Sequence, residues 1–123
     1  MTDLISFLNA RLDEDEAIAQ SAAKRMGSPD WRQAATDDGR DTVVMGEREV
    51  GLHSLLGTHI ARHDPARILR EIEADRSLLA KLRQVEEFGE RLRIDTEILI
   101  LRQVIAIRAA IWSDHPDYKG WLQ

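Results

Sequence analysis

An Asp-Pro step near the middle of the chain constrains the fold more than any other feature of the sequence. Proline disfavours the α conformation in the residue before it, so a helix that contains His63 must end by Asp64. Pro65 suits the first position of a new helix, where its missing N–H group leaves no hydrogen bond unmade. The carboxylate of Asp64 can then accept from the free N–H groups of that first turn. The sequence therefore predicts a bend at Asp64 and a helix that begins at Pro65.

Apolar residues on both sides of this bend follow a helical spacing. Downstream they recur every three or four positions and predict one long helix with an apolar stripe. The stripe comprises Ile68, Leu69, Ile72, Leu79, Leu82 and Val85. Arg67 and Glu71 are four residues apart on this helix, so we expect a same-face ion pair. Upstream, residues 52–63 predict a short helix from which His59 and His63 project on one face.

The N-terminal half predicts one more helix and a small sheet. Residues 2–26 carry an amphipathic pattern that stops at the Gly-Ser-Pro step of residues 27–29. Between residues 31 and 50, short β-prone runs flank an Asp-Gly pair and predict a hairpin. A third short run near Glu49 and Val50 can extend it.

The most apolar segment, residues 98–112, belongs to a predicted helix that is apolar on two sides. One stripe comprises Ile94, Ile98, Leu101, Ile105 and Trp112, and the other comprises Ile100, Val104, Ile107 and Ile111. A helix of this kind belongs at the centre of a core. Upstream, Gly89 either ends the preceding helix in a tight turn, which favours an antiparallel pair, or is tolerated inside a continuous helix.

Together these elements predict an α+β fold, mainly α, that forms a single domain over residues 1–123. The expected order is an N-terminal helix, a small β-hairpin, a short helix, a long antiparallel helical pair and a C-terminal tail that folds back. Pro116 ends the last helix and starts that tail. The length suits one modest hydrophobic core.

Charge and composition exclude several classes of function. The chain has 17 basic and 22 acidic residues and a net charge of -5, which disfavours binding to nucleic acid or anionic lipid. It has no cysteine, which excludes disulfides, a thiolate nucleophile and cysteine-ligated zinc. No signal peptide is evident, and charged residues interrupt the apolar segment, which is too short to span a bilayer. We therefore expect a cytoplasmic location without membrane contact.

Histidines and carboxylates stand near the predicted helix ends in a pattern that suits a divalent metal. His59 and His63 present two imidazoles from one helix face, and imidazole is the commonest metal ligand in proteins. Zn²⁺ needs three or four ligands, so the candidates for the rest are His115 from the tail and Glu16 or Asp13 from the first helix. The expected metal is Zn²⁺ or Mn²⁺, which would activate a bound water for hydrolysis.

A structural interpretation of the same residues is the stronger one. The sequence has no His-Glu-x-x-His motif, and Asp64 has an immediate use as a helix cap. Contacts to a protein or ligand are a third interpretation. The candidate binding residues are Asp64, Arg67, Glu71, Asp114, Asp117 and Tyr118.

Three sequence blocks carry a resemblance to a known family. FLNARLDEDEAIAQ, HIARHDPARILREIEADR and DHPDYKGW resemble a family of small actinobacterial and actinophage proteins that is classed as a domain of unknown function. The resemblance implies a cytoplasmic setting in a bacterium of that lineage or its bacteriophage. It implies no reaction, because none is known for the family.

The leading functional hypothesis is a non-enzymatic protein-interaction module. No catalytic motif accompanies the unusually apolar last helix, which a chain of this length cannot fully cover. The expected partner is a host or virion protein, and self-association is a further prediction. The alternative is a metal-dependent hydrolase of phosphoester or nucleotide bonds that uses the histidine and carboxylate residues, so whether the chain is an enzyme stays open.

Overall fold

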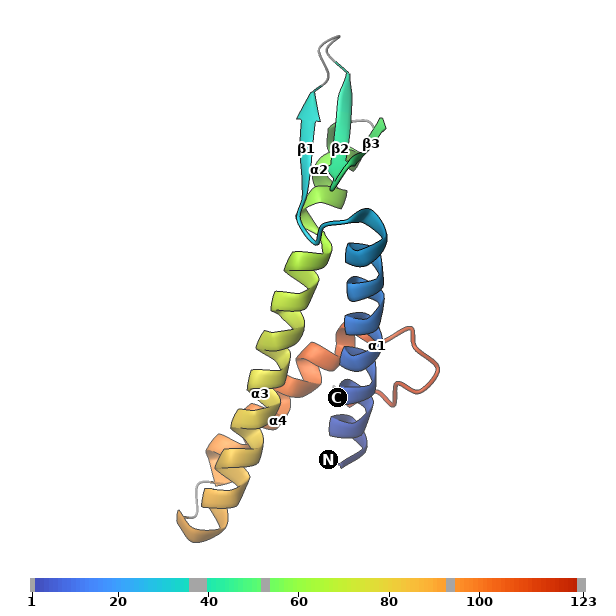
Figure 1. Ribbon diagram of the computed structural model, residues 1–123. Helices are drawn as coiled ribbons and strands as arrows, with labels where there is room; N and C mark the ends of the chain where they lie inside the picture. The colour runs from blue at the N-terminus through green and yellow to red at the C-terminus, as the bar shows by residue number, and fades with distance from the viewer. Residues whose placement is uncertain (1, 36–39, 52–53, 93–94, 122–123) are drawn as a thin grey trace. The chain divides into compact units, whose positions relative to one another are not determined.

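The computed structural model describes residues 2–35, 40–51, 54–92 and 95–121. The elements follow in the order α1 (Thr2–Met26), β1 (Trp31–Ala35), β2 (Asp41–Met45), β3 (Arg48–Gly51), α2 (Ser54–Arg62), α3 (Pro65–Leu92), α4 (Asp95–Ala109) and the 3₁₀ turn η1 (Ala110–Trp112) (Figure 1). This confirms the predicted α+β, mainly α fold. The third β-prone run is a strand, and the predicted Asp-Gly turn lies outside the described residues.

The elements form two compact units. Unit 1 comprises Met1–Asp13 and Glu73–Gln123, and unit 2 comprises Glu14–Ile72. Both α1 and α3 contribute residues to each unit. The single domain over residues 1–123 stays a prediction.

In unit 2, helix α2 packs on an antiparallel sheet with the strand order β1-β2-β3 (Figure 1). Val43 of β2 is fully buried. A Cβ atom added to Gly57 of α2 would lie 3.3 Å from the Cγ2 atom of Val43. Glycine therefore lets the helix approach the sheet closely. The neighbouring Thr58 donates its hydroxyl to Oε1 of Gln33 in β1 at 2.5 Å.

The turn between β2 and β3 also requires glycine. Gly46 has a φ of 62°, in the left-handed region that side chains disfavour. A Cβ atom there would collide with the carbonyl oxygen of Met26, at the end of α1. This glycine therefore allows the sheet to meet the end of the helix.

Helix α3 begins at Pro65, as predicted, and continues through Gly89 to Leu92. Of the two alternatives for Gly89, the structure supports tolerance inside the helix. Residues 93–94, between α3 and α4, lie outside the described residues.

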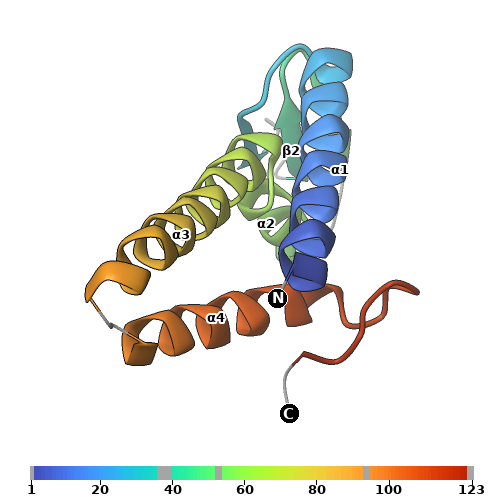
Figure 2. The same cartoon turned by 90° about the horizontal axis from the view of Figure 1, so that it is seen from below.

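In unit 1, α4 runs antiparallel to α3 (Figure 2). Arg102 of α4 donates to Oε1 of Glu86 at 2.8 and 3.0 Å, while Arg108, farther along α4, reaches Asp75, nearer the start of α3. The buried apolar residues of this unit are Leu4, Phe7, Leu8 and Leu12 of α1, Leu82 of α3, and Ile105, Ala106 and Ala109 of α4. Within the described parts of the chain, none of the helices combines the length and apolar character that a membrane span requires.

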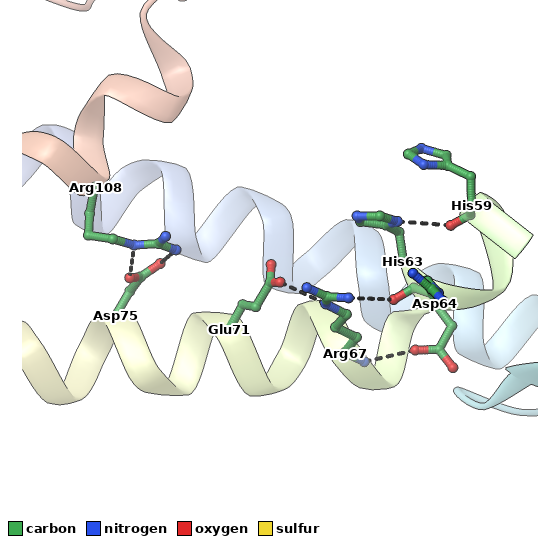
Figure 3. Close-up of polar contacts among 8 residues, drawn as sticks. His59, His63, Asp64, Arg67, Glu71, Asp75 and Arg108 are labelled. Carbon is green, nitrogen blue, oxygen red and sulfur yellow. Dashed lines mark hydrogen bonds and ion pairs between the residues drawn. The ribbon is translucent and has the colours of Figure 1, made fainter.

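The contact between Asp75 and Arg108 is the most buried ion pair among the described residues whose geometry is known. Arg108 donates through Nε to Oδ1 at 2.6 Å and through Nη2 to Oδ2 at 2.9 Å (Figure 3). The side chain of Asp75 is 4% exposed and that of Arg108 is 35% exposed. Two parallel bonds between planar groups restrict both distance and orientation, so the pair fixes the rotation of α4 about its own axis.

The C-terminal tail folds back on the first turns of α1, as predicted. The ring of Phe7 contacts the rings of His115, Tyr118 and Trp121, with centroids 5.1–5.8 Å apart. Lys119 pairs with Asp3 at 3.1 Å. Aromatic contacts of this kind add to the burial of apolar area.

We expect Arg108→Met to lower the free energy of unfolding by about 3 kcal/mol, because it leaves the buried Asp75 carboxylate without its cation. Asp75→Asn should cost less, because Arg108 is partly hydrated. The matched control is Arg67→Met, which removes an exposed ion pair and should cost about 0.5 kcal/mol or less. Urea unfolding measures all three, and an Arg108→Met cost no larger than that of the control would contradict this role.

Candidate functional site

Asp64 joins three segments of unit 2 at the bend. Its Oδ1 atom accepts from the backbone N–H of Arg67 at 2.9 Å, which confirms the predicted N-cap of α3. Its Oδ2 atom accepts from the backbone N–H of Trp31, the first residue of β1, at 3.0 Å. The side chain is buried, so both bonds are shielded from water and hold β1 against the start of α3.

The two histidines at the bend lie together, as their spacing predicted. Their rings are 4.4 Å apart at 34°. Nδ1 of His63 lies 2.8 Å from the carbonyl oxygen of His59 (Figure 3). A carbonyl oxygen can only accept, so Nδ1 of His63 carries the hydrogen and Nε2 is the nitrogen left for another partner.

His115 lies in unit 1, where both of its ring nitrogens contact other groups of the chain. The guanidinium of Arg11 lies against Nε2, and the backbone N–H of Asp117 lies 3.1 Å from Nδ1. A metal could bind this imidazole only after one of these contacts breaks. The positive charge of Arg11 next to this ring would also repel a metal cation.

The predicted metal ligands are therefore divided between the units. His59, His63 and Glu16 belong to unit 2 and His115 to unit 1. Glu16 already has a polar partner within the chain. Asp13 pairs with Arg76 at 3.0 Å. Over the described ranges, no group of three or more His, Asp or Glu side chains is arranged to hold a metal ion, and the metal site stays a prediction.

The other predicted binding residues have local partners or lie on the surface. Arg67 and Glu71 form the expected ion pair at 3.0 Å, with both side chains almost half exposed. Tyr118 packs on Phe7, and Asp114 and Asp117 are exposed. Their role in binding a ligand or protein stays a prediction.

Several large apolar side chains of α4 and of the η1 turn that follows it reach solvent. Of the two predicted stripes, the one with Ile105 is turned inward, and Ile105 itself is fully buried. Ile94 of this stripe lies outside the described residues. The second stripe faces outward: Ile100, Ile107 and Ile111 are 53%, 58% and 58% exposed. Val104, the fourth member of this row, is half-buried. Monomeric proteins rarely leave several large apolar side chains of one helix side in water. We refer to Ile100, Val104 and Ile107 of α4, together with Ile111 of the η1 turn, as the α4 stripe.

One flank of the α4 stripe carries no charge, and the other flank includes the exposed Glu97. The flank on one side consists of Thr96, Gln103 and Ala110, which recur every seven residues and are uncharged. On the other side, Arg108 is held by Asp75. Charged residues are depleted at the centres of protein interfaces, and the uncharged flank shares this feature.

Three features of these sites were not predicted from the sequence: the burial of Asp75 and two contacts between residues far apart in the chain. Asp75 follows Ile72 by three residues and so falls on the apolar stripe of α3. This position indicates a buried carboxylate, which requires a polar or charged partner. By contrast, nothing in the local sequence connects Trp31 with Asp64 or Arg11 with His115.

Comparison with known proteins identifies the family. The model of a family described as "Family of unknown function (DUF6221)" matches residues 1–123. The chain belongs to this family. DUF6221 membership agrees with the resemblance to a family without a known function, and the actinobacterial or phage origin stays a prediction. Neither the curated proteins nor the solved structures include a significant match.

We expect Asp64→Ala to lower the free energy of unfolding by about 2 kcal/mol, because it removes a helix cap and an acceptor for the Trp31 N–H group. Asp64→Asn keeps one acceptor oxygen and should cost roughly half as much. His63→Ala, at an exposed neighbouring position, is the matched control and should cost about 0.5 kcal/mol or less. Equal costs for Asp64→Ala and His63→Ala in urea unfolding would show that Asp64 does not hold the bend.

Proposed function

We propose that this chain is a non-enzymatic protein-interaction module that acts in the cytoplasm and binds through the α4 stripe. The observation that carries the proposal is the exposure of one apolar side of α4 while the opposite side is buried. A helix that is apolar on both sides is ordinarily enclosed on both sides. Here the second side lacks a cover among the described residues, and a partner protein would supply it.

The spacing of the α4 stripe supports a helical partner. Ile100, Val104, Ile107 and Ile111 follow one another at steps of four, three and four residues. This is the spacing with which two helices pack their side chains in a coiled-coil seam. The seam spans three turns, so it fits a short helix pair better than a flat surface.

Among helical partners, a second copy of this chain fits best. Two copies offer the same spacing to each other, as a two-fold symmetric interface requires. The net charge of -5 opposes association, but Thr96, Gln103 and Ala110 on one flank of the α4 stripe are uncharged and add no repulsion there. Glu97 lies on the other flank. We therefore propose α4–α4 pairing in a homodimer, and a host or virion protein is the competing occupant.

The proposal predicts that the mass measured by light scattering rises with concentration from 14.0 kDa toward twice that value. Ile107→Glu should keep the chain monomeric at every concentration, because pairing would bury two carboxylates against each other. Ile18→Glu is the matched control: Ile18 is 63% exposed, compared with 58% for Ile107, and lies on α1 in unit 2. This control should associate like the wild-type chain.

Two outcomes would contradict the homodimer. The first is a wild-type chain that stays monomeric up to millimolar concentration. The second is association that Ile107→Glu and Ile18→Glu weaken equally, which would indicate non-specific attraction between apolar surfaces.

A further inference from the structure

Unit 2 contains an open groove of about 350 Å³ that the proposed function does not use. One wall consists of Ile18 and Ala22, which lie one helical turn apart on α1, and the other includes Ile68 of α3. The indole of Trp31 contributes to the same apolar lining, and its N–H group already donates to the carbonyl oxygen of Ser28 at 3.1 Å. The groove thus offers apolar and aromatic surface, and its volume suits a small molecule.

His63, which lines this groove, supplies a hydrogen-bond acceptor. Because its Nδ1–H group donates to the carbonyl oxygen of His59, the neutral ring has a lone pair on Nε2. Among the residues that the structure describes, no protein group is bonded to this nitrogen. Asp15 also lines the groove but already has a partner within the chain. The groove therefore presents one oriented hydrogen-bond acceptor beside an apolar surface.

The side of the groove formed by β1 and the start of α3 is held in place before a ligand arrives. Asp64 accepts from the backbone of Trp31 on one side and from that of Arg67 on the other, so a single buried carboxylate sets the distance between β1 and the start of α3. His63 is held in turn by the last turn of α2. A preformed site binds a rigid ligand with little loss of conformational entropy.

From this geometry we infer that the groove is a binding site for a small planar aromatic molecule with one N–H or O–H donor. The aromatic body would pack against Trp31, Ile18 and Ile68, and the donor would bond to Nε2 of His63. This inference is independent of the α4 stripe, which lies in the other unit.

Two matched probes test the inference by fluorine NMR. A fluorinated indole carries an N–H donor, and the corresponding fluorinated benzofuran has nearly the same shape with an oxygen in place of that group. In neutral to mildly basic buffer, we expect the indole to bind about 10-fold more tightly, since one hydrogen bond to a fixed acceptor contributes at most about 1.5 kcal/mol net. His63→Phe should keep the apolar wall and remove this preference.

Filling the groove provides a second test. Ala22→Trp should prevent both probes from binding, while Leu55→Trp, which adds the same side chain on the exposed face of α2, should leave binding unchanged. Circular dichroism verifies that both variants are folded. The inference is overturned if the wild-type chain binds neither probe, if folded Ala22→Trp binds the indole like the wild type, or if His63→Phe retains the 10-fold preference.

Discussion

The bidentate pair between Asp75 and Arg108 determines which side of α4 reaches solvent. A buried carboxylate is costly without a partner, and in this chain the partner must come from one position on α4. Because Arg108 points to α3, Ile105 and Ala109 turn into the core of unit 1 and the α4 stripe turns outward. Rotating α4 to bury the stripe instead would move Arg108 away and leave Asp75 unpaired. The exposed surface on which the proposed function depends is therefore a consequence of one buried charge.

A second buried carboxylate has a comparable effect in unit 2. Asp64 has no ion-pair partner of known geometry among the described residues, and its two oxygens accept from backbone N–H groups of β1 and α3. Such charge-assisted bonds are stronger than those between neutral groups. They set the bend, orient the helix that follows, and define one end of the groove that His63 lines. In both units a buried acid therefore fixes the position of a helix.

Features that depend on neighbouring residues could be predicted from the sequence. The start of α3 at Pro65, the cap by Asp64 and the Arg67–Glu71 pair all follow from spacing within one or two turns. The two stripes of α4 were also evident, because helical periodicity is a local property. Which of the two stripes is buried could not be predicted, because it depends on Asp75, which is 33 residues from Arg108 in the sequence.

The same limit explains what was missed in the candidate sites. Arg11 and His115 are 104 residues apart in the sequence, and no local pattern predicts their contact. The sequence grouped His115 with His59 and His63 because their residue types suit one metal. In the structure His59 and His63 contact each other in unit 2, and His115 has its own contacts in unit 1. Residue type alone indicates which chemistry is available, and long-range packing determines which groups can use it.

Thiol labelling tests the orientation of α4 and the pairing of its stripe most directly, because the chain has no native cysteine and an introduced one is unique. In dilute protein, the thiol of Ile107→Cys should react on the order of 100-fold faster than that of Ile105→Cys, which requires local opening. Raising the protein concentration should slow the reaction of Ile107→Cys and leave that of Ile18→Cys unchanged. Equal rates for Ile107→Cys and Ile105→Cys, or a rate for Ile107→Cys that does not depend on concentration, would contradict the account.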